Sequence, residues 1–140
     1  MAELLPIDVL LPHRSAMRFL DEALDLQPDR ATCRGVVRAD NPFVRDGVLD
    51  PVALIEFIAQ AAAALVTSQD PTRGPVRGWL VAGRNVELAA GDIPVGGVLE
   101  VDVIEAAKVG DFASFDGVVR CQGREVGRGN VKVFKSAEGA

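Results

Sequence analysis

Polar and apolar residues alternate over residues 30–39, which is the period of a strand with one buried face. A second strand is predicted over residues 18–26, and a short helical turn over residues 7–11 is ended by Pro12. The turn-forming sequence at 27–29 separates the two strands. The first part of the chain therefore predicts a helical turn followed by a pair of strands.

The longest apolar run, over residues 51–66, predicts a central helix. Asp50 and Pro51 mark its start, because an aspartate side chain can cap free amide groups and proline suits the first helical position. Only Glu56 and Gln60 interrupt the apolar run, so we expect the helix to be buried nearly all round.

After a loop, the remainder of the chain holds strand patterns only. Turns at 109–111 and 122–124 have the spacing of hairpins. The predicted strands and apolar phases cover 79–88, 98–107, 113–119 and 131–133. This order predicts the α+β class, with residues 1–140 forming a single domain in which an antiparallel sheet is wrapped around one long central helix.

Composition excludes several classes of function. The chain of 140 residues has 15 Lys and Arg against 20 Asp and Glu, and a net charge of −5 disfavours binding to the phosphate backbone of nucleic acids. No apolar run approaches the roughly 20 residues of a membrane span. The N-terminus lacks the basic start and apolar stretch of a signal peptide, so we expect a cytoplasmic protein.

The two cysteines do not form a metal-binding pattern. Cys33 and Cys121 lie far apart in the sequence, and neither has a second metal ligand near it. A structural zinc site needs about four ligands. We therefore expect two buried, unreactive thiols and no metal or redox cofactor.

Glu56 is the most informative residue, because a carboxylate on an apolar helix is unfavourable unless it has a partner or is protonated. Gln60 lies one helical turn later on the same face. In a structural interpretation, Glu56 reaches a solvated edge or pairs with an arginine such as Arg84. In a functional interpretation, Glu56 is a general acid or base, or polarises water, in a pocket beside the helix.

His13, the only histidine, is the second candidate for chemistry. It is a possible general base, and the alternatives are a cap or a structural residue with satisfied hydrogen bonds. Its neighbour Arg14 is either structural or an anion contact.

Two further features are candidate binding sites. Amide groups after Asp50, or in the loop at 45–48, could polarise a carbonyl oxygen as an oxyanion hole does, although capping alone would explain Asp50. Arg73, Arg77 and Arg84 are either ordinary surface charge or a docking patch for an anionic partner or a phosphate group. We expect Gln60, Asp50 and Arg84 to be substrate-binding residues.

Four segments resemble the hotdog-fold 3-hydroxyacyl-[acyl carrier protein] dehydratases, in the same order. The opening LPHRSAMRFLD, the short segment NPF, the helix IEFIAQAA and the hairpin FDGVVRCQGREVGRG are similar to that family, at 11–21, 41–43, 55–62 and 115–129. The resemblance covers nearly the whole chain. It implies a hotdog fold and an active site between two chains, with a histidine from one chain and the helix carboxylate, here Glu56, from the other.

The family's histidine normally stands just before the helix, but the corresponding stretch, 44–51, is shorter here and contains none. The chain therefore looks most similar to the dehydratase-like hotdog proteins of aryl-polyene-type clusters. Those proteins lack the same loop and keep both the LPH opening and the E-x-x-A-Q helix.

The resemblance implies a dehydratase acting on a 3-hydroxyacyl thioester, in fatty-acid or polyketide-type biosynthesis. Its substrate would arrive on the phosphopantetheine arm of an acyl carrier protein or of coenzyme A, with the arginine patch as the docking site. Glu56 would donate a proton to the β-hydroxyl group and His13 would remove the α-proton. The alternatives are a hotdog thioesterase that uses the helix carboxylate, and a non-catalytic acyl-binding or partner subunit. Exposed strand edges predict a homodimer or a higher homo-oligomer.

Overall fold

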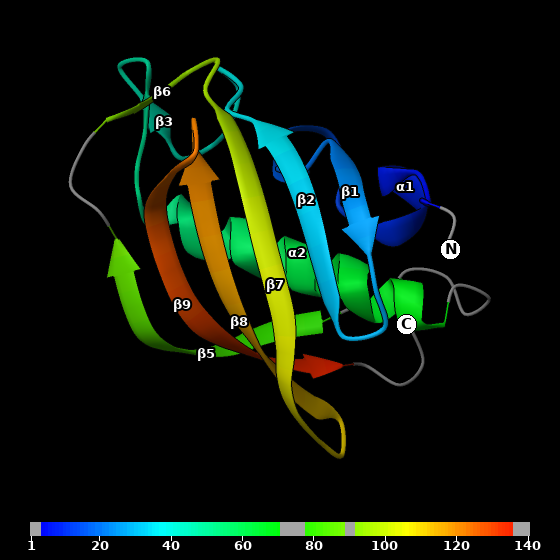
Figure 1. Cartoon of the computed structure of the whole chain (residues 1–140). Coiled ribbons are helices and arrows are strands. Elements are labelled where there is room, and N and C mark those ends of the chain that lie inside the picture. The colour runs from blue at the N-terminus through cyan, green and yellow to red at the C-terminus, as the bar shows by residue number, and fades with distance from the viewer. Residues whose placement is uncertain (1–3, 71–77, 89–91, 136–140) are drawn as a thin grey trace.

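A six-stranded antiparallel sheet curves around one long helix in the computed structural model, which describes residues 4–70, 78–88 and 92–135 (Figure 1). The strands of this sheet lie in the order β1-β2-β7-β8-β9-β5, and a small second sheet has the order β3-β4-β6. The elements are α1 (Ile7–Leu10), η1 (Ser15–Met17), β1 (Glu22–Leu26), β2 (Arg30–Val36), β3 (Val44–Arg45), β4 (Val48–Leu49), α2 (Ala53–Gln69), β5 (Gly78–Leu88), β6 (Ile93–Pro94), β7 (Val98–Val109), β8 (Phe112–Cys121) and β9 (Arg124–Lys135). The predicted α+β architecture, a sheet wrapped around a central helix, is confirmed.

Most predicted elements are present, with shifted ends. The helix begins at Ala53 rather than at residue 51, because Pro51 and Val52 form a turn in which the Val52 amide donates to Asp50 Oδ1 at 3.0 Å. The first strand is shorter than predicted and starts at Glu22. Before this strand, Asp21 is still held against β2: its amide donates to the Arg34 carbonyl oxygen at 2.8 Å, and its carboxylate accepts hydrogen bonds from the Val36 amide and from Arg38.

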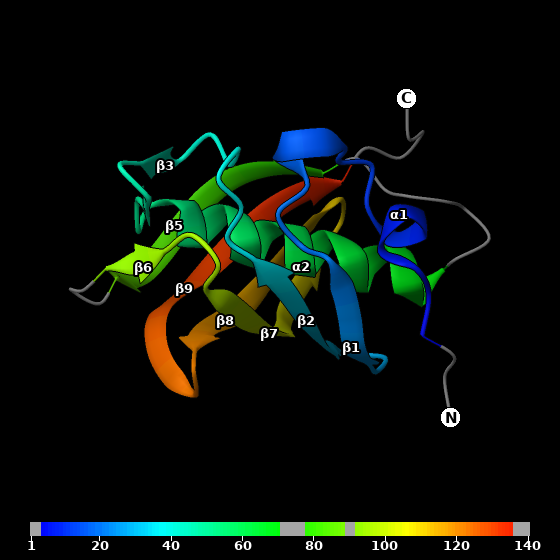
Figure 2. The same ribbon diagram turned by 90° about the horizontal axis from the view of Figure 1, so that it is seen from above.

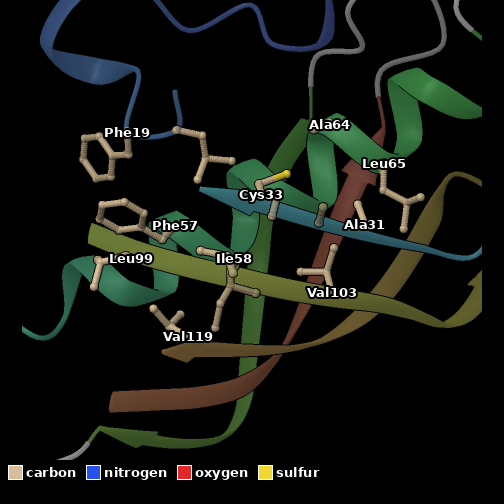
Figure 3. Close-up of a cluster of buried hydrophobic side chains, with 14 of the residues drawn as sticks. Phe19, Ala31, Cys33, Phe57, Ile58, Ala64, Leu65, Leu99, Val103 and Val119 are labelled. Atoms are coloured by element: carbon tan, nitrogen blue, oxygen red, sulfur yellow. The ribbon is translucent and has the colours of Figure 1, made fainter. Parts of the chain in front are cut away.

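The core lies between α2 and the concave face of the sheet. Figure 3 shows Phe57, Ile58 and Leu65 of the helix in one cluster with buried side chains of β2, β7 and β8. Each fully buried large apolar side chain contributes roughly 1.5–3 kcal/mol relative to exposure. The helix lies very close to β8 at Gly117, where a Cβ atom would be 2.4 Å from Ile58 Cγ2.

The expectation that the central helix is buried nearly all round needs correction on one side. Val52, just before the helix, is 45% exposed, and a half-buried stripe of the helix follows it: Ile55, Glu56, Ala59 and Ala63. The sheet covers only the opposite side of α2. Figure 2 shows α2 along the inside of the curved sheet, with α1 beside its C-terminal part.

Three short strands were not predicted, because two residues are too few to show an alternating pattern. The expectation of buried thiols is confirmed for Cys33, whose pKa burial raises to about 12. Cys121 is only half-buried. Among the described residues, no helix is long and apolar enough to cross a membrane.

Candidate active site

The first turn of α2 carries Glu56 on the side that the sheet leaves uncovered. Its side chain is 30% exposed, so the carboxylate is partly shielded from water and still reachable. The structural alternative of a pair with Arg84 is not observed in the described part of the chain, where the side chain that faces the Glu56 carboxylate is His13.

The segment after α1 presents His13 to the same place. Buried Leu10 and Leu11 anchor this segment in the core. The Arg14 guanidinium donates to the carbonyl oxygens of Leu11, His13 and Asp8, at 2.6, 2.7 and 3.0 Å. Of the two roles considered for Arg14, the structure shows the structural one, because these bonds fix the backbone on both sides of the histidine.

His13 Nε2 lies 3.7 Å from Glu56 Oε2. The other ring nitrogen, Nδ1, is buried and has no hydrogen-bond partner among the residues that the structure describes. Burial lowers the pKa of His13 below its ordinary 6.5, and this effect outweighs the nearby Glu56 carboxylate, which raises the pKa; Arg14 also lowers it. The imidazole is therefore neutral near pH 7, with Nε2 as the nitrogen that faces the carboxylate.

Gln60 connects the two halves of this site. It is completely buried. Its Nε2 donates to Glu56 Oε2 and to the Met17 carbonyl oxygen, both at 2.8 Å, and its Oε1 accepts from the Phe19 amide at 2.9 Å. One side chain thus holds the carboxylate and clamps the backbone that follows His13.

Gln60 was expected to bind substrate, but its polar atoms are already engaged by the protein and none is exposed. The backbone partners of Gln60 are residues that sequence analysis missed. No sequence signal could have shown them, because any residue type supplies the same backbone groups.

The start of α2 does not form the expected oxyanion hole with residues 52–55. The Val52 amide donates to Asp50 Oδ1, and the next three amides donate to the carbonyl oxygens of Asp50, Pro51 and Val52. The Asp50 side chain therefore stabilises the turn before α2 rather than capping the helix, whose N-cap residue is Val52 with no side-chain cap, and these four amides are occupied by local acceptors.

Arg84 lies on β5 and is exposed, whereas Arg73 and Arg77 fall outside the described residues. The hydrogen bonds and ion pairs of the described chain do not join Arg84 to either His13 or Glu56. The structure thus brings together three of the five candidate site residues, His13, Glu56 and Gln60, and leaves Asp50 in its turn and Arg84 on the sheet.

The lowered pKa of His13 gives a direct prediction for its titration. Because the chain has one histidine, its imidazole signals in an NMR spectrum are unambiguous, and we expect a midpoint below 6.5. Glu56 raises this pKa, so Glu56→Gln should move the midpoint further down. An unfolded chain takes up this proton at a higher pH than the folded one, so folding stability should decrease as the pH falls below 6.5. A midpoint at or above 6.5, or an upward shift in Glu56→Gln, would contradict the prediction.

Comparisons with known proteins agree with this architecture. Residues 5–140 match the family model of the ApeP-like proteins, described as ApeP dehydratase. The dehydratase heterocomplex ApeI:P from Xenorhabdus doucetiae is similar in structure, with a TM-score of 0.87 and 26% sequence identity over 97% of this chain and 94% of that chain. No curated protein sequence matches the chain significantly.

More distant structures share the fold. AziG from S. sahachiroi has a TM-score of 0.63 and 24% identity, over 83% of this chain and 90% of that one. A hypothetical thioesterase from Streptococcus pneumoniae, crystallised with coenzyme A, has a TM-score of 0.64 and 14% identity, over 82% of this chain and 84% of that one. Identities this low show the common hotdog fold and nothing about activity.

Proposed function

Because the chain belongs to the ApeP-like dehydratase family, we propose that this dehydratase-like hotdog protein removes water from a 3-hydroxyacyl thioester, with His13 and Glu56 as its catalytic residues. The observation that carries the proposal is the distance of 3.7 Å between His13 Nε2 and Glu56 Oε2. Elimination of water needs a base at the α-carbon and an acid at the β-hydroxyl group, and one imidazole beside one carboxyl group supplies both.

His13 acts as the base in this proposal. The neutral imidazole has one N–H and one ring lone pair; in this proposal the N–H is on Nδ1, and the lone pair on Nε2 accepts the α-proton. Since Nδ1 is buried, Nε2 is the nitrogen available to a substrate. The buried environment that lowers the pKa of His13 thus keeps the base in its reactive form.

Glu56 acts as the acid. Gln60 holds Oε2, while the hydrogen bonds of the described residues leave Oε1 for the substrate. His13 takes the α-proton and passes it to the Glu56 carboxylate, which delivers it to the departing hydroxyl group; water leaves and both side chains return to their starting forms. Gln60 is a positioning residue here, because it touches the carboxylate and the backbone near His13 but is itself inaccessible to a substrate.

The arrangement also supports activity in a chain that lacks the loop histidine of the 3-hydroxyacyl-[acyl carrier protein] dehydratases. The resemblance implied that the histidine and the carboxylate come from different chains. In this structure both belong to one chain, and the N-terminal segment supplies the histidine. A partner's histidine is therefore not needed to complete the pair.

The test is turnover of a 3-hydroxyacyl thioester, on coenzyme A and on an acyl carrier protein, with the enoyl product and free thiol measured separately. We expect enoyl product without thiol release. Release of thiol that is lost in Glu56→Gln would instead identify a thioesterase, the alternative on the same fold. A folded protein that forms neither product would favour a non-catalytic partner subunit.

We propose in addition that the chain assembles with at least one more hotdog chain. The ApeI:P dehydratase of Xenorhabdus doucetiae is a heterocomplex. Here β5 pairs with β9 on one side and is the last strand of its sheet, and Leu80 and Leu88 on it are 45% and 38% exposed. An open apolar edge of this kind favours pairing with another strand. The test is analytical ultracentrifugation of the purified chain, first alone and then mixed with a second hotdog subunit. A chain that sediments as a monomer in both experiments would refute this proposal.

A further inference from the structure

Arg84, which the proposed reaction does not use, lines a hollow on the sheet with a volume of about 320 Å³. Strands β5, β7, β8 and β9 all contribute to it. The lining residues are Arg84, Ala107, Val109, Phe112, Ala113, Ser114, Asn130 and Lys132. This volume is at the small end of the range for ligand-binding sites, roughly 300–1,000 Å³.

The polar side chains of the hollow lie on the face of the sheet that points away from α2. Ser114 and Lys132 are paired in the β8–β9 register, and Asn130 is paired with Arg84 in the β5–β9 register. Their neighbours along these strands, including Phe115 and Val131, are buried in the core. Because side chains alternate between the faces of a sheet, the hollow is separated from the His13–Glu56 pair by the sheet itself.

The charges at this hollow differ from those elsewhere on the same face. Other arginines there are neutralised by carboxylates, in the pairs Arg34–Glu22 at 2.9 Å, Arg120–Asp102 at 2.6 Å and Arg128–Glu125 at 2.5 Å.

In contrast, Arg84 and Lys132 make no ion pair with any described residue, and no acidic side chain lines the hollow, although the chain has 20 Asp and Glu. Beside the hollow, Asp116 Oδ1 accepts a hydrogen bond from the lining residue Asn130 at 3.0 Å, so one carboxylate stands against two lining cations and the local balance is still positive.

The remainder of the hollow is apolar. Lys132 Nζ lies 4.9 Å from the centre of the Phe112 ring, and the Phe112 and Phe134 rings are 5.3 Å apart. Val109 is 74% exposed at the end of the β7–β8 hairpin, which extends beyond the rest of the sheet (Figure 1). An exposed aromatic ring and an aliphatic side chain lie beside two cations that form no ion pair with the described residues, and this combination suits a ligand with one charged end and a short apolar part.

We propose that this hollow binds a small amphipathic anion, in which a carboxylate or a phosphate monoester is attached to a short apolar chain. Arg84 and Lys132 bind the acid group, and Phe112 and Val109 contact the chain. The Ser114 hydroxyl donates a hydrogen bond to the acid group, as does the second N–H of the Asn130 amide, whose first N–H is bound to Asp116. The site is distinct from the His13–Glu56 pair and does not depend on the reaction proposed for that pair.

The test uses the full chain labelled with ¹⁵N and titrated with hexanoate, hexyl phosphate, neutral hexanamide and inorganic phosphate. We expect both organic anions to shift the backbone amide signals of Ser114, Asn130 and Lys132, while the His13 imidazole signals stay in place. Hexanamide and inorganic phosphate should bind at least about tenfold more weakly, since each lacks one of the two parts. Whichever organic anion binds more tightly identifies the acid group, and either order supports the site.

The matched variants are R84Q/K132Q and R30Q/R124Q, which each remove two positive charges from exposed positions. We expect the first to raise the Kd for both organic anions by at least about tenfold and the second by less than about twofold. Any of three results would overturn the proposal. The two variants could have equal Kd values, hexanamide could bind as tightly as hexanoate, or the amide shifts could occur near His13 instead of at the hollow. The comparison with hexanamide uses the unaltered chain, so it does not depend on how the variants fold.

Discussion

Replacing Glu56 with glutamine should lower kcat/KM for dehydration of a 3-hydroxyacyl thioester by about 10²- to 10⁴-fold, the usual contribution of a positioned acid or base. Glutamine has nearly the same shape as glutamate, and its side-chain oxygen can still accept the hydrogen bond from Gln60. The geometry of the site is therefore preserved while the dissociable proton is lost. Enoyl product formed per unit time, measured over a range of substrate concentrations, checks this expectation.

Glu100→Gln is the matched control for this experiment. Glu100 is exposed on β7 and lies outside the proposed site, so the same chemical change should leave kcat/KM within about twofold of the original. If Glu56→Gln were equally active and still folded, the carboxyl group of Glu56 would not be the acid, and the proposed mechanism would be wrong.

The second large effect concerns folding. Gly35→Ala should destabilise the protein by about 3 kcal/mol, at the upper end of the usual cost of overpacking, which lowers Tm by roughly 10 °C. A Cβ atom at this position would lie 2.2 Å from the Phe19 carbonyl oxygen and 3.2 Å from Leu20 Cα. Both contacts are with backbone, which cannot rotate away as a side chain can, so the segment before β1 must move. Urea unfolding followed by circular dichroism measures the change in free energy.

Gly83→Ala provides the comparison, because a Cβ atom there has its nearest neighbour, Val86 Cγ2, at 3.4 Å. We expect a change in the free energy of unfolding within about 0.5 kcal/mol. The segment displaced in Gly35→Ala includes Phe19, whose amide donates to Gln60, so this variant should also lose activity at temperatures where it remains folded. Equal stability of the two variants would show that the backbone around Phe19 is less constrained than the structure indicates.

Local patterns in the sequence determined most of the elements. The alternation in residues 30–39, the hairpin turns and the apolar run after Asp50 each depend on neighbours a few residues apart, and the corresponding elements are present. The same local reasoning identified Glu56, because a carboxylate stands out on an apolar helix. It also singled out His13, the only histidine of the chain. Short-range periodicity and side-chain chemistry are properties that a sequence displays directly.

Only the tertiary structure decided how these parts combine. It placed His13 beside Glu56 within one chain. It also gave Gln60 hydrogen bonds to Phe19 and Met17, which lie 41 and 43 positions earlier in the sequence. It also put Arg84 in a hollow with Lys132, because β5 pairs with β9, the last strand of the chain. Such pairings depend on which strands become neighbours and on how buried backbone groups find partners. A backbone amide or carbonyl is the same in nearly every residue, so the sequence gives no local sign of the contact that it will make.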